Sequence, residues 1–181
     1  MTDLPLAQTV RRAGDWRGVA EIVTLDYDTR FLRRKRLATD TGRPFVVDLE
    51  KTTSLEDGDA LELDDGSRVV IRAAEEDVLV VTGKSIPRLA WHIGNRHTPC
   101  QIDTDRLLIQ RDPVIRRMLE QLGATIAEAR HAFTPEGGAY GHGRTHSHDH
   151  GHSHSHSHSH SPDKFHEHDA EHDPDETVDA G

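Results

Sequence analysis

The chain has 181 residues, of which only 34% are hydrophobic and 4% aromatic, a smaller apolar share than a fully packed domain usually has. Its formal net charge of −10 disfavours nucleic acid as the main partner, because phosphate binding needs a basic surface. The single cysteine excludes an intrachain disulfide framework and a multi-cysteine zinc finger, and no apolar run approaches the roughly 18 residues of a membrane span.

The shortage of apolar residues is concentrated in residues 141–181. Twelve of the 15 histidines lie there, together with nine acidic and two basic side chains. The first ten residues, MTDLPLAQTV, lack a basic stretch followed by an apolar core, so no secretory signal is visible. We therefore expect a cytoplasmic protein without membrane attachment, in which a folded body precedes an acidic, histidine-rich tail.

The first part of the body, residues 1–73, is predicted to be a small all-β domain. Strand-forming patterns cover residues 19–23, 31–37, 44–49 and 67–71. The basic cluster at residues 33–36 is interpreted as the solvated part of a strand, not as a binding patch. The domain is expected to serve as a scaffold or as a contact surface for a partner peptide.

The second part, residues 74–140, alternates strand and helix signals in the order β-α-β-β-α-β. Strands are predicted over 78–81, 99–102, 106–109 and 124–132. Between them lie a helix with Ser85 as N-cap, ended by a left-handed Gly94-Asn95, and a helix with Asp112 as N-cap and Pro113 at its first position. The second helix is expected to bury Val114, Ile115, Met118, Leu119 and Leu122. This order predicts a ferredoxin-like domain, and hence an α+β protein of two domains.

The tail, residues 141–181, has histidine at every second position from 146 to 160, separated by serine, aspartate or glycine. Such a composition forms no packed core, so we expect disorder. Neutral imidazoles bind nickel, copper and zinc, and neighbouring acids attract cations. The predicted metal ligands here are His142, His146, His148, His150, His152, His154, His156, His158 and His160. A purification tag and a pH-sensitive solubilising tail are the alternative interpretations.

The body contains three further histidines and the only cysteine. His92 is predicted to lie on the first helix as a surface or packing residue, and His131 in the last strand. His97 follows the break at residues 94–95, so it is expected to project from a loop and to be a candidate ligand. Cys100 is expected to pack in the interior next to Pro99, with a ligand role as the alternative.

Residues 91–102, WHIGNRHTPCQI, resemble the W-H-x-G-N-R-H-x-P-x-Q-I signature of the UreE-type urease accessory proteins. Residues 112–123, DPVIRRMLEQLG, are similar to the second-helix motif of that family, and residues 133–140, FTPEGGAY, to its F-x-P-E-x-G-A-Y segment. The resemblance covers nearly the whole chain, and histidine-rich tails are common in the family.

The resemblance implies a nickel metallochaperone that supplies Ni²⁺ during assembly of the urease active site. It implies a homodimer in which His97 of each protomer binds one metal ion at the interface, with tail histidines as further ligands. The implied partners are the urease accessory GTPase and the apo-urease complex. Some relatives carry histidines just before or after the residue matching Asp112, but residues 110–113 contain none here, so an accessory site is not expected there.

Two other functions are considered. In a storage or detoxification protein that buffers nickel, zinc or copper, the tail would carry the whole function. A metal-dependent hydrolase would need a general base beside a fixed three-ligand ion, and the body has no H-x-H or H-E-x-x-H spacing, so we do not expect an enzyme. The sequence does not rank nickel against zinc or copper.

Overall fold

A computed structural model gives the structure of the chain and describes residues 4–137. The nine predicted tail ligands from His142 to His160, and the predicted disorder of the tail, lie outside the described residues. Neither helix in the described part of the chain is long and apolar enough to cross a membrane.

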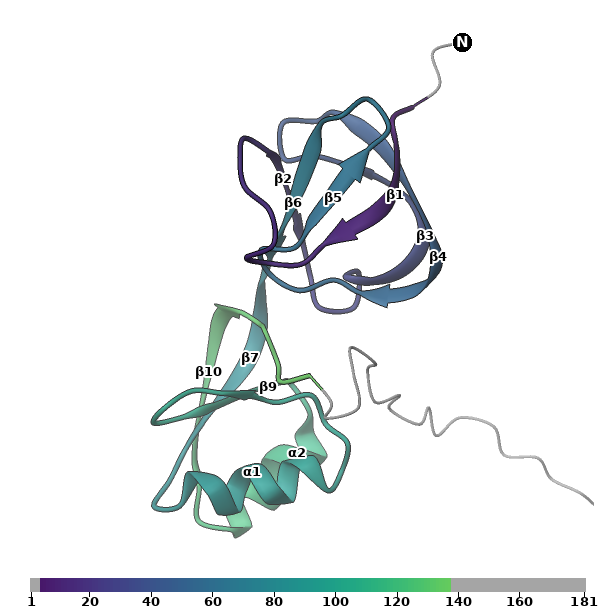
Figure 1. Cartoon of the computed structure of the whole chain (residues 1–181). Helices are drawn as coiled ribbons and strands as arrows, with labels where there is room; N and C mark the ends of the chain where they lie inside the picture. The colour runs from purple at the N-terminus through teal and green to yellow at the C-terminus, as the bar shows by residue number, and fades with distance from the viewer. Residues whose placement is uncertain (1–3, 138–181) are drawn as a thin grey trace, which may run out of the picture. The chain divides into compact units, whose positions relative to one another are not determined.

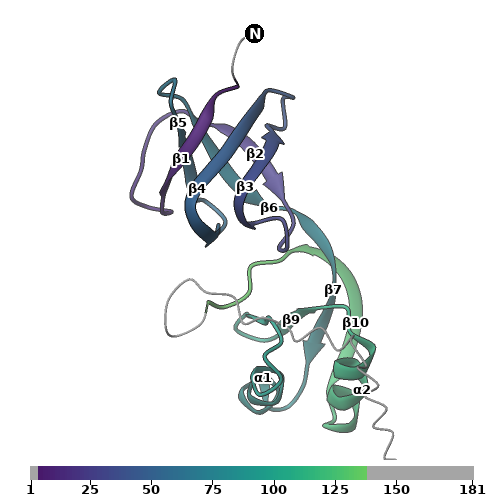
Figure 2. The same ribbon diagram turned by 90° about the vertical axis from the view of Figure 1, so that its right-hand side faces the viewer.

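Six strands near the N-terminus form one sheet, in the order β2-β6-β5-β1-β4-β3 (Figures 1 and 2). Their bounds are β1 (Leu6–Arg11), β2 (Glu21–Leu25), β3 (Phe31–Ala38), β4 (Pro44–Ser54), β5 (Ala60–Leu63) and β6 (Arg68–Ala73). Neighbouring strands are antiparallel except for the pairs β1–β4 and β2–β6, which are parallel. The turn after β3 joins the two edges of the sheet, because Asp40 N donates to Ile22 O of β2 at 2.8 Å.

The core of this sheet comes from alternate strand residues. Phe45, Val47 and Leu49 of β4 point inward, and residues of the other strands complete the cluster. The basic residues 33–36 of β3 are all exposed, which confirms their interpretation as the solvated part of a strand.

Two predictions for this region need correction. The strand predicted from Val19 begins at Glu21, and Val19 is 97% exposed, because β2 pairs with β6 only from Glu21 onward. No strand was predicted over β1 or β5. In β1 a bulge between Ala7 and Thr9 breaks the alternation that marks a strand in the sequence.

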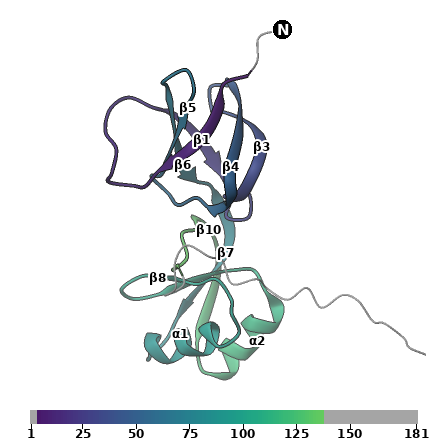
Figure 3. The same ribbon diagram turned by 45° about the vertical axis from the view of Figure 1, so that its right-hand side comes forward.

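The remaining elements form a four-stranded antiparallel sheet in the order β10-β7-β9-β8, with two helices. Their bounds are β7 (Glu75–Thr82), α1 (Ile86–Gly94), β8 (Gln101–Ile102), β9 (Leu107–Gln110), α2 (Pro113–Gln121) and β10 (Thr125–Ala132). The predicted order β-α-β-β-α-β is the order observed. Both helices lie on the same side of the sheet (Figure 3).

The two faces of this sheet have different partners. Leu79 and Val81 of β7 pack with α1, α2 and β9, whereas Val78 and Leu108 pack on the other face with Phe133. The period of two in a strand separates the two sets. The side of the sheet without helices is thus covered in part by the segment that follows β10.

The N-cap residues of both helices are the predicted ones, but one burial prediction is wrong. The Asp112 carboxylate accepts hydrogen bonds from Val114 N at 2.7 Å and Ile115 N at 2.9 Å. Ser85 is the N-cap of α1, although its side chain makes no capping bond. Val114 is 73% exposed instead of buried, because the first turn of α2 turns this side chain away from the sheet, and Ile115 and Leu119 are the buried residues of the helix.

Candidate metal centre

His97 lies in a hydrogen-bonded turn that extends the C-terminal end of α1. Asn95 N donates to Trp91 O at 3.0 Å, Arg96 N to Ile93 O at 3.0 Å, and His97 N to Gly94 O at 2.9 Å. The chain therefore leaves the helix at His97, and the imidazole is exposed as the sequence predicted.

The predicted left-handed end at residues 94–95 is wrong. Asn95 keeps right-handed helical angles, with φ −62° and ψ −15°. His97 instead has φ 54° and is the only non-glycine residue with a positive φ among those described. Helical hydrogen bonding continues through Asn95 and Arg96, so the left-handed residue lies at His97, three positions after the predicted Gly94. Backbone strain in a non-glycine residue is often found at functional sites.

Charges of both signs lie beside His97. The carbonyl end of a helix carries a partial negative charge, and the turn places His97 directly beyond that end of α1. The neighbouring Arg96 places a positive charge at the same end, because Arg96 Nη1 donates to His92 O at 3.1 Å. Within residues 4–137, no group of three or more histidine, cysteine or carboxylate side chains is close enough together to hold a metal ion.

The other two body histidines lie on separate elements. His92 is half-buried on α1, where its ring meets Trp91 edge-on at 4.9 Å between centroids. His131 is in β10 opposite Glu76 of β7. Trp91 itself is 63% exposed, and Ile102, five residues after His97, is 48% exposed.

Cys100 has the features of a packing residue. It packs against the helix-side core, and its Sγ lies 3.7 Å from Gln101 O. Burial, and to a lesser degree the charge of Glu136, raises the pKa of the Cys100 thiol to about 12. A thiol binds metal as the thiolate, so this environment opposes a ligand role.

Four hydrogen bonds fix the chain segment that leads to the tail, here named the strap (residues 133–137). Gln101 Oε1 accepts hydrogen bonds from Thr134 N at 2.9 Å and Thr134 Oγ1 at 3.3 Å. Glu136 N donates to Cys100 O at 2.9 Å, and Arg30 Nη2 donates to Phe133 O. The strap is thereby attached to the residues that follow His97.

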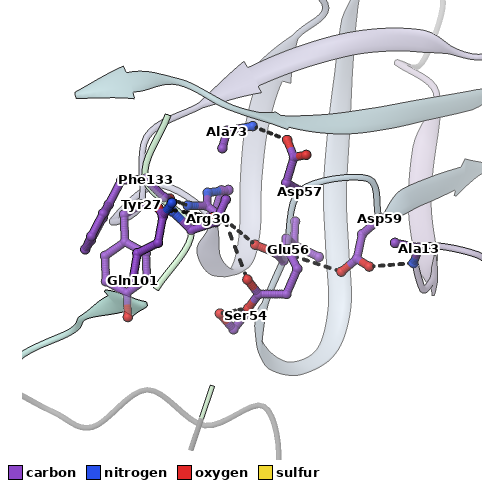
Figure 4. Close-up of polar contacts among 12 residues, drawn as sticks. Ala13, Tyr27, Arg30, Ser54, Glu56, Asp57, Asp59, Ala73, Gln101 and Phe133 are labelled. Carbon is purple, nitrogen blue, oxygen red and sulfur yellow. Dashed lines mark hydrogen bonds and ion pairs between the residues drawn. The ribbon is translucent and has the colours of Figure 1, made fainter. Parts of the chain in front are cut away.

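Sequence reasoning gave no individual role to Gln101 or Arg30. The quoted signature includes Gln101, and that is the only sequence signal for it. Arg30 has no local signal, because a lone arginine before a strand is ordinarily solvated, yet here it is fully buried beside Tyr27 and Phe133 (Figure 4).

Comparison with known proteins assigns the chain to a family. The model described as UreE urease accessory protein, N-terminal domain, matches residues 5–74, and the C-terminal domain model of the same description matches residues 76–161. The chain is 62% identical over 143 residues to urease accessory protein UreE of Ruegeria pomeroyi, which covers 79% of this chain and 96% of that protein. It is 59% identical over 146 residues to the Cereibacter sphaeroides protein of that name, covering 80% of each. For the Paracoccus denitrificans protein the identity is 62% over 126 residues, covering 70% and 80%. The chain therefore belongs to the UreE family of urease accessory proteins.

Proposed function

We propose that this protein is a nickel metallochaperone that acts in urease maturation. It binds Ni²⁺ through His97 and the tail histidines and donates the ion to apo-urease, together with the urease accessory GTPase, in the cytoplasm. Family membership and the names of the relatives support the role in urease maturation. The observation that carries the metal site is the exposed imidazole of His97 on a strained turn at the carbonyl end of α1.

The proposed site is shared by two protomers of a homodimer. A single exposed imidazole holds a divalent ion weakly, whereas two imidazoles related by a two-fold axis bind one ion on or near that axis. Trp91 and Ile102, large apolar side chains left exposed on either side of His97 in the sequence, favour an interface in this region. Tail imidazoles would complete a coordination sphere without thiolates, which suits release of the ion to a site with higher affinity.

We further propose a ferredoxin-like C-terminal domain over residues 74–140, an all-β N-terminal domain over 1–73 that holds partner peptide, and a metal-binding tail over 141–181. The strand order β10-β7-β9-β8, antiparallel throughout, supports the ferredoxin-like assignment. The change from one family model to the next between residues 74 and 76 supports the domain boundary, and the second model extends into the tail as far as residue 161.

The division between His97 and the tail is tested by equilibrium dialysis against Ni²⁺. We compare the full chain with a chain that ends at Tyr140, each with and without His97→Ala. The shortened dimer should bind about one ion, and His97→Ala should abolish that binding, because the shared site then lacks both body imidazoles. In the full chain, His97→Ala should leave most of the bound metal on the tail.

His92→Ala is the matched control, since it removes an imidazole from α1, the helix that precedes His97, without changing residue 97. It should bind nickel like the parent chain. A shortened dimer that retains several ions, or none, would contradict the proposal.

A storage or detoxification protein for nickel, zinc or copper is the second candidate, favoured by the eight alternating histidines from 146 to 160. Activation of urease in a reconstituted mixture separates the two functions. Delivery requires that His97→Ala reduce activation although most metal remains bound. Storage alone predicts no effect.

A further inference from the structure

The strap connects two opposite edges of the C-terminal sheet. It begins directly after β10, which forms one edge, and Glu136 bonds to Cys100, which directly precedes β8 at the other edge. The strap starts from Ala132, which pairs with Glu75, whereas Gln101 of β8 lies in the row of Leu108, Val80 and Ala127, so its two ends differ in position along the strands as well as across the sheet. Four residues reach at most about 14 Å when fully extended. The strap must therefore be nearly extended.

The strap crosses on the side of the sheet without helices. Phe133 is fully buried against Val78 and Leu108 of that face, and its ring meets Tyr27 edge-on at 5.4 Å between centroids. Pro135 is also buried, and as a proline it keeps Thr134 extended. Burial and backbone stiffness thus favour an extended path over this face of the sheet.

Polar side chains hold the first two residues of the strap, and the bond from Glu136 N to Cys100 O holds its far end. At its start, the buried Arg30 guanidinium donates to Phe133 O and to Leu55 O, the latter at 3.4 Å, and it pairs with Glu56 at 3.7 Å (Figure 4). Further along, the Gln101 amide accepts from Thr134 and donates to Asp103 Oδ1 at 3.1 Å. Each of these bonds holds the strap against the sheet.

We propose that the strap is a positioning device that carries the origin of the histidine-rich tail across the sheet to the edge next to His97, with Arg30 and Gln101 as the positioning residues. Without it, the tail would start from Ala132 at the opposite edge of the sheet. With it, the first tail histidine, His142, follows the fixed strap end at Gly137 by only five residues. The short tether raises the effective concentration of tail imidazoles at His97. This inference rests on the proposed joint use of His97 and the tail.

A metal-free distance measurement tests the placement of the strap. Nitroxide labels are attached at Gly94→Cys and Gly137→Cys in a Cys100→Ser background, since neither glycine has an atom within 4 Å of an added Cβ. Labelled chains are mixed with an excess of unlabelled chains, so that electron spin resonance reads the distance within one chain. Arg30→Met combined with Gln101→Ala should broaden that distance and lengthen it by up to about 10 Å, the reach of the three residues that follow Thr134.

Gln110→Ala is the matched control, because Gln110 is a half-buried glutamine on the neighbouring strand β9 whose amide bonds to Glu76 and not to the strap. It should leave the distance unchanged. If the double variant also leaves the distance unchanged, the strap does not depend on these residues and the inference is overturned.

A second variant keeps every strap contact and so avoids any loss of folding. Twelve glycine and serine residues inserted between Gly137 and Gly138 lengthen the tether to His142 from five residues to 17. Effective concentration falls with about the −3/2 power of tether length, so Ni²⁺ should bind about sixfold more weakly at the His97 site of the full chain. The same twelve residues added after Gly181 should have no effect.

The two hypotheses fail in different ways. If His97→Ala leaves the strongest Ni²⁺ affinity of the full chain unchanged, the proposed function fails, whereas the label distances still report on the strap. If His97→Ala weakens binding but the insertion after Gly137 does not, the metal site stands and the role of the strap is overturned.

Discussion

Replacement of His97 by glycine should stabilise the fold relative to alanine at the same position while both substitutions remove the metal ligand. At φ 54°, the Cβ of an L residue crowds the following carbonyl, at a cost of about 1–2 kcal/mol. Glycine avoids this cost but loses about 0.4–1 kcal/mol through the greater freedom of its unfolded chain. The difference leaves the His97→Gly protein more stable than the His97→Ala protein by about 1 kcal/mol.

Position 94 provides the control of opposite sign. Gly94 lies at the end of α1 without a positive φ, and an added Cβ there meets no atom within 4 Å. A protein with alanine at residue 94 should therefore be more stable than one with glycine there, by up to about 1 kcal/mol, as in other helices. The preference between glycine and alanine should reverse within three residues of the chain.

The assay is urea unfolding of the metal-free protein in the presence of a chelator. The slope of the unfolding free energy against urea concentration should be the same for all variants, so that differences in midpoint report differences in stability. Nickel binding is measured in parallel on chains that end at Tyr140. His97→Gly and His97→Ala should both lower Ni²⁺ affinity by more than the roughly 10–100-fold typical of losing a residue that merely supports a ligand.

Two results would refute this reasoning. Equal stabilities of His97→Gly and His97→Ala would mean that the backbone at residue 97 is not left-handed in solution. Unchanged nickel affinity in the shortened chains would mean that the imidazole is not a ligand. The expected outcome, a more stable protein without its metal site, is the usual trade between stability and function at a strained residue.

Three further predictions concern the supporting structure. Asp112→Ala removes the cap of α2 and should lower the unfolding free energy by about 1–2 kcal/mol in urea, whereas Asp105→Ala in an exposed turn should change it by less than about 0.5 kcal/mol. The hydrogen bond from Arg43 lowers the pKa of Glu21 below its ordinary 4.5, so this pair stabilises the fold above that pH and the contribution is lost as the pH falls through the lowered value. Arg43→Met should therefore be destabilising in urea at pH 7, and its difference from the parent should shrink towards pH 3. Because the pKa of Cys100 is raised to about 12, its thiolate fraction at pH 8 is roughly 1,000-fold below that of an ordinary thiol. Iodoacetamide should therefore modify Cys100 as fast as it modifies an ordinary thiol only after the protein is unfolded.

Local patterns in the sequence were sufficient wherever a residue acts on its immediate neighbours. The Asp112-Pro113 start of α2 was predictable because the carboxylate bonds to amides only two and three residues away. The exposed position of His97 and the β-α-β-β-α-β order followed in the same way from turn residues and hydrophobic period. The resemblance of residues 91–102 to the UreE signature was then confirmed by matches to both family models.

Two features did not follow from these patterns, one of them local and the other decided by contacts between distant parts of the chain. Gly94-Asn95 is an ordinary helix end by composition, but continued helical bonding moved the left-handed residue to His97. Nothing near Arg30 in the sequence indicates that it is buried against Phe133, 103 residues later. Local propensity determines which short elements form, whereas the path of the strap past the neighbourhood of His97 depends on sheet order and on burial between segments far apart in sequence. Only the tertiary structure fixes the order of the strands in the sheet and the burial between segments far apart in sequence.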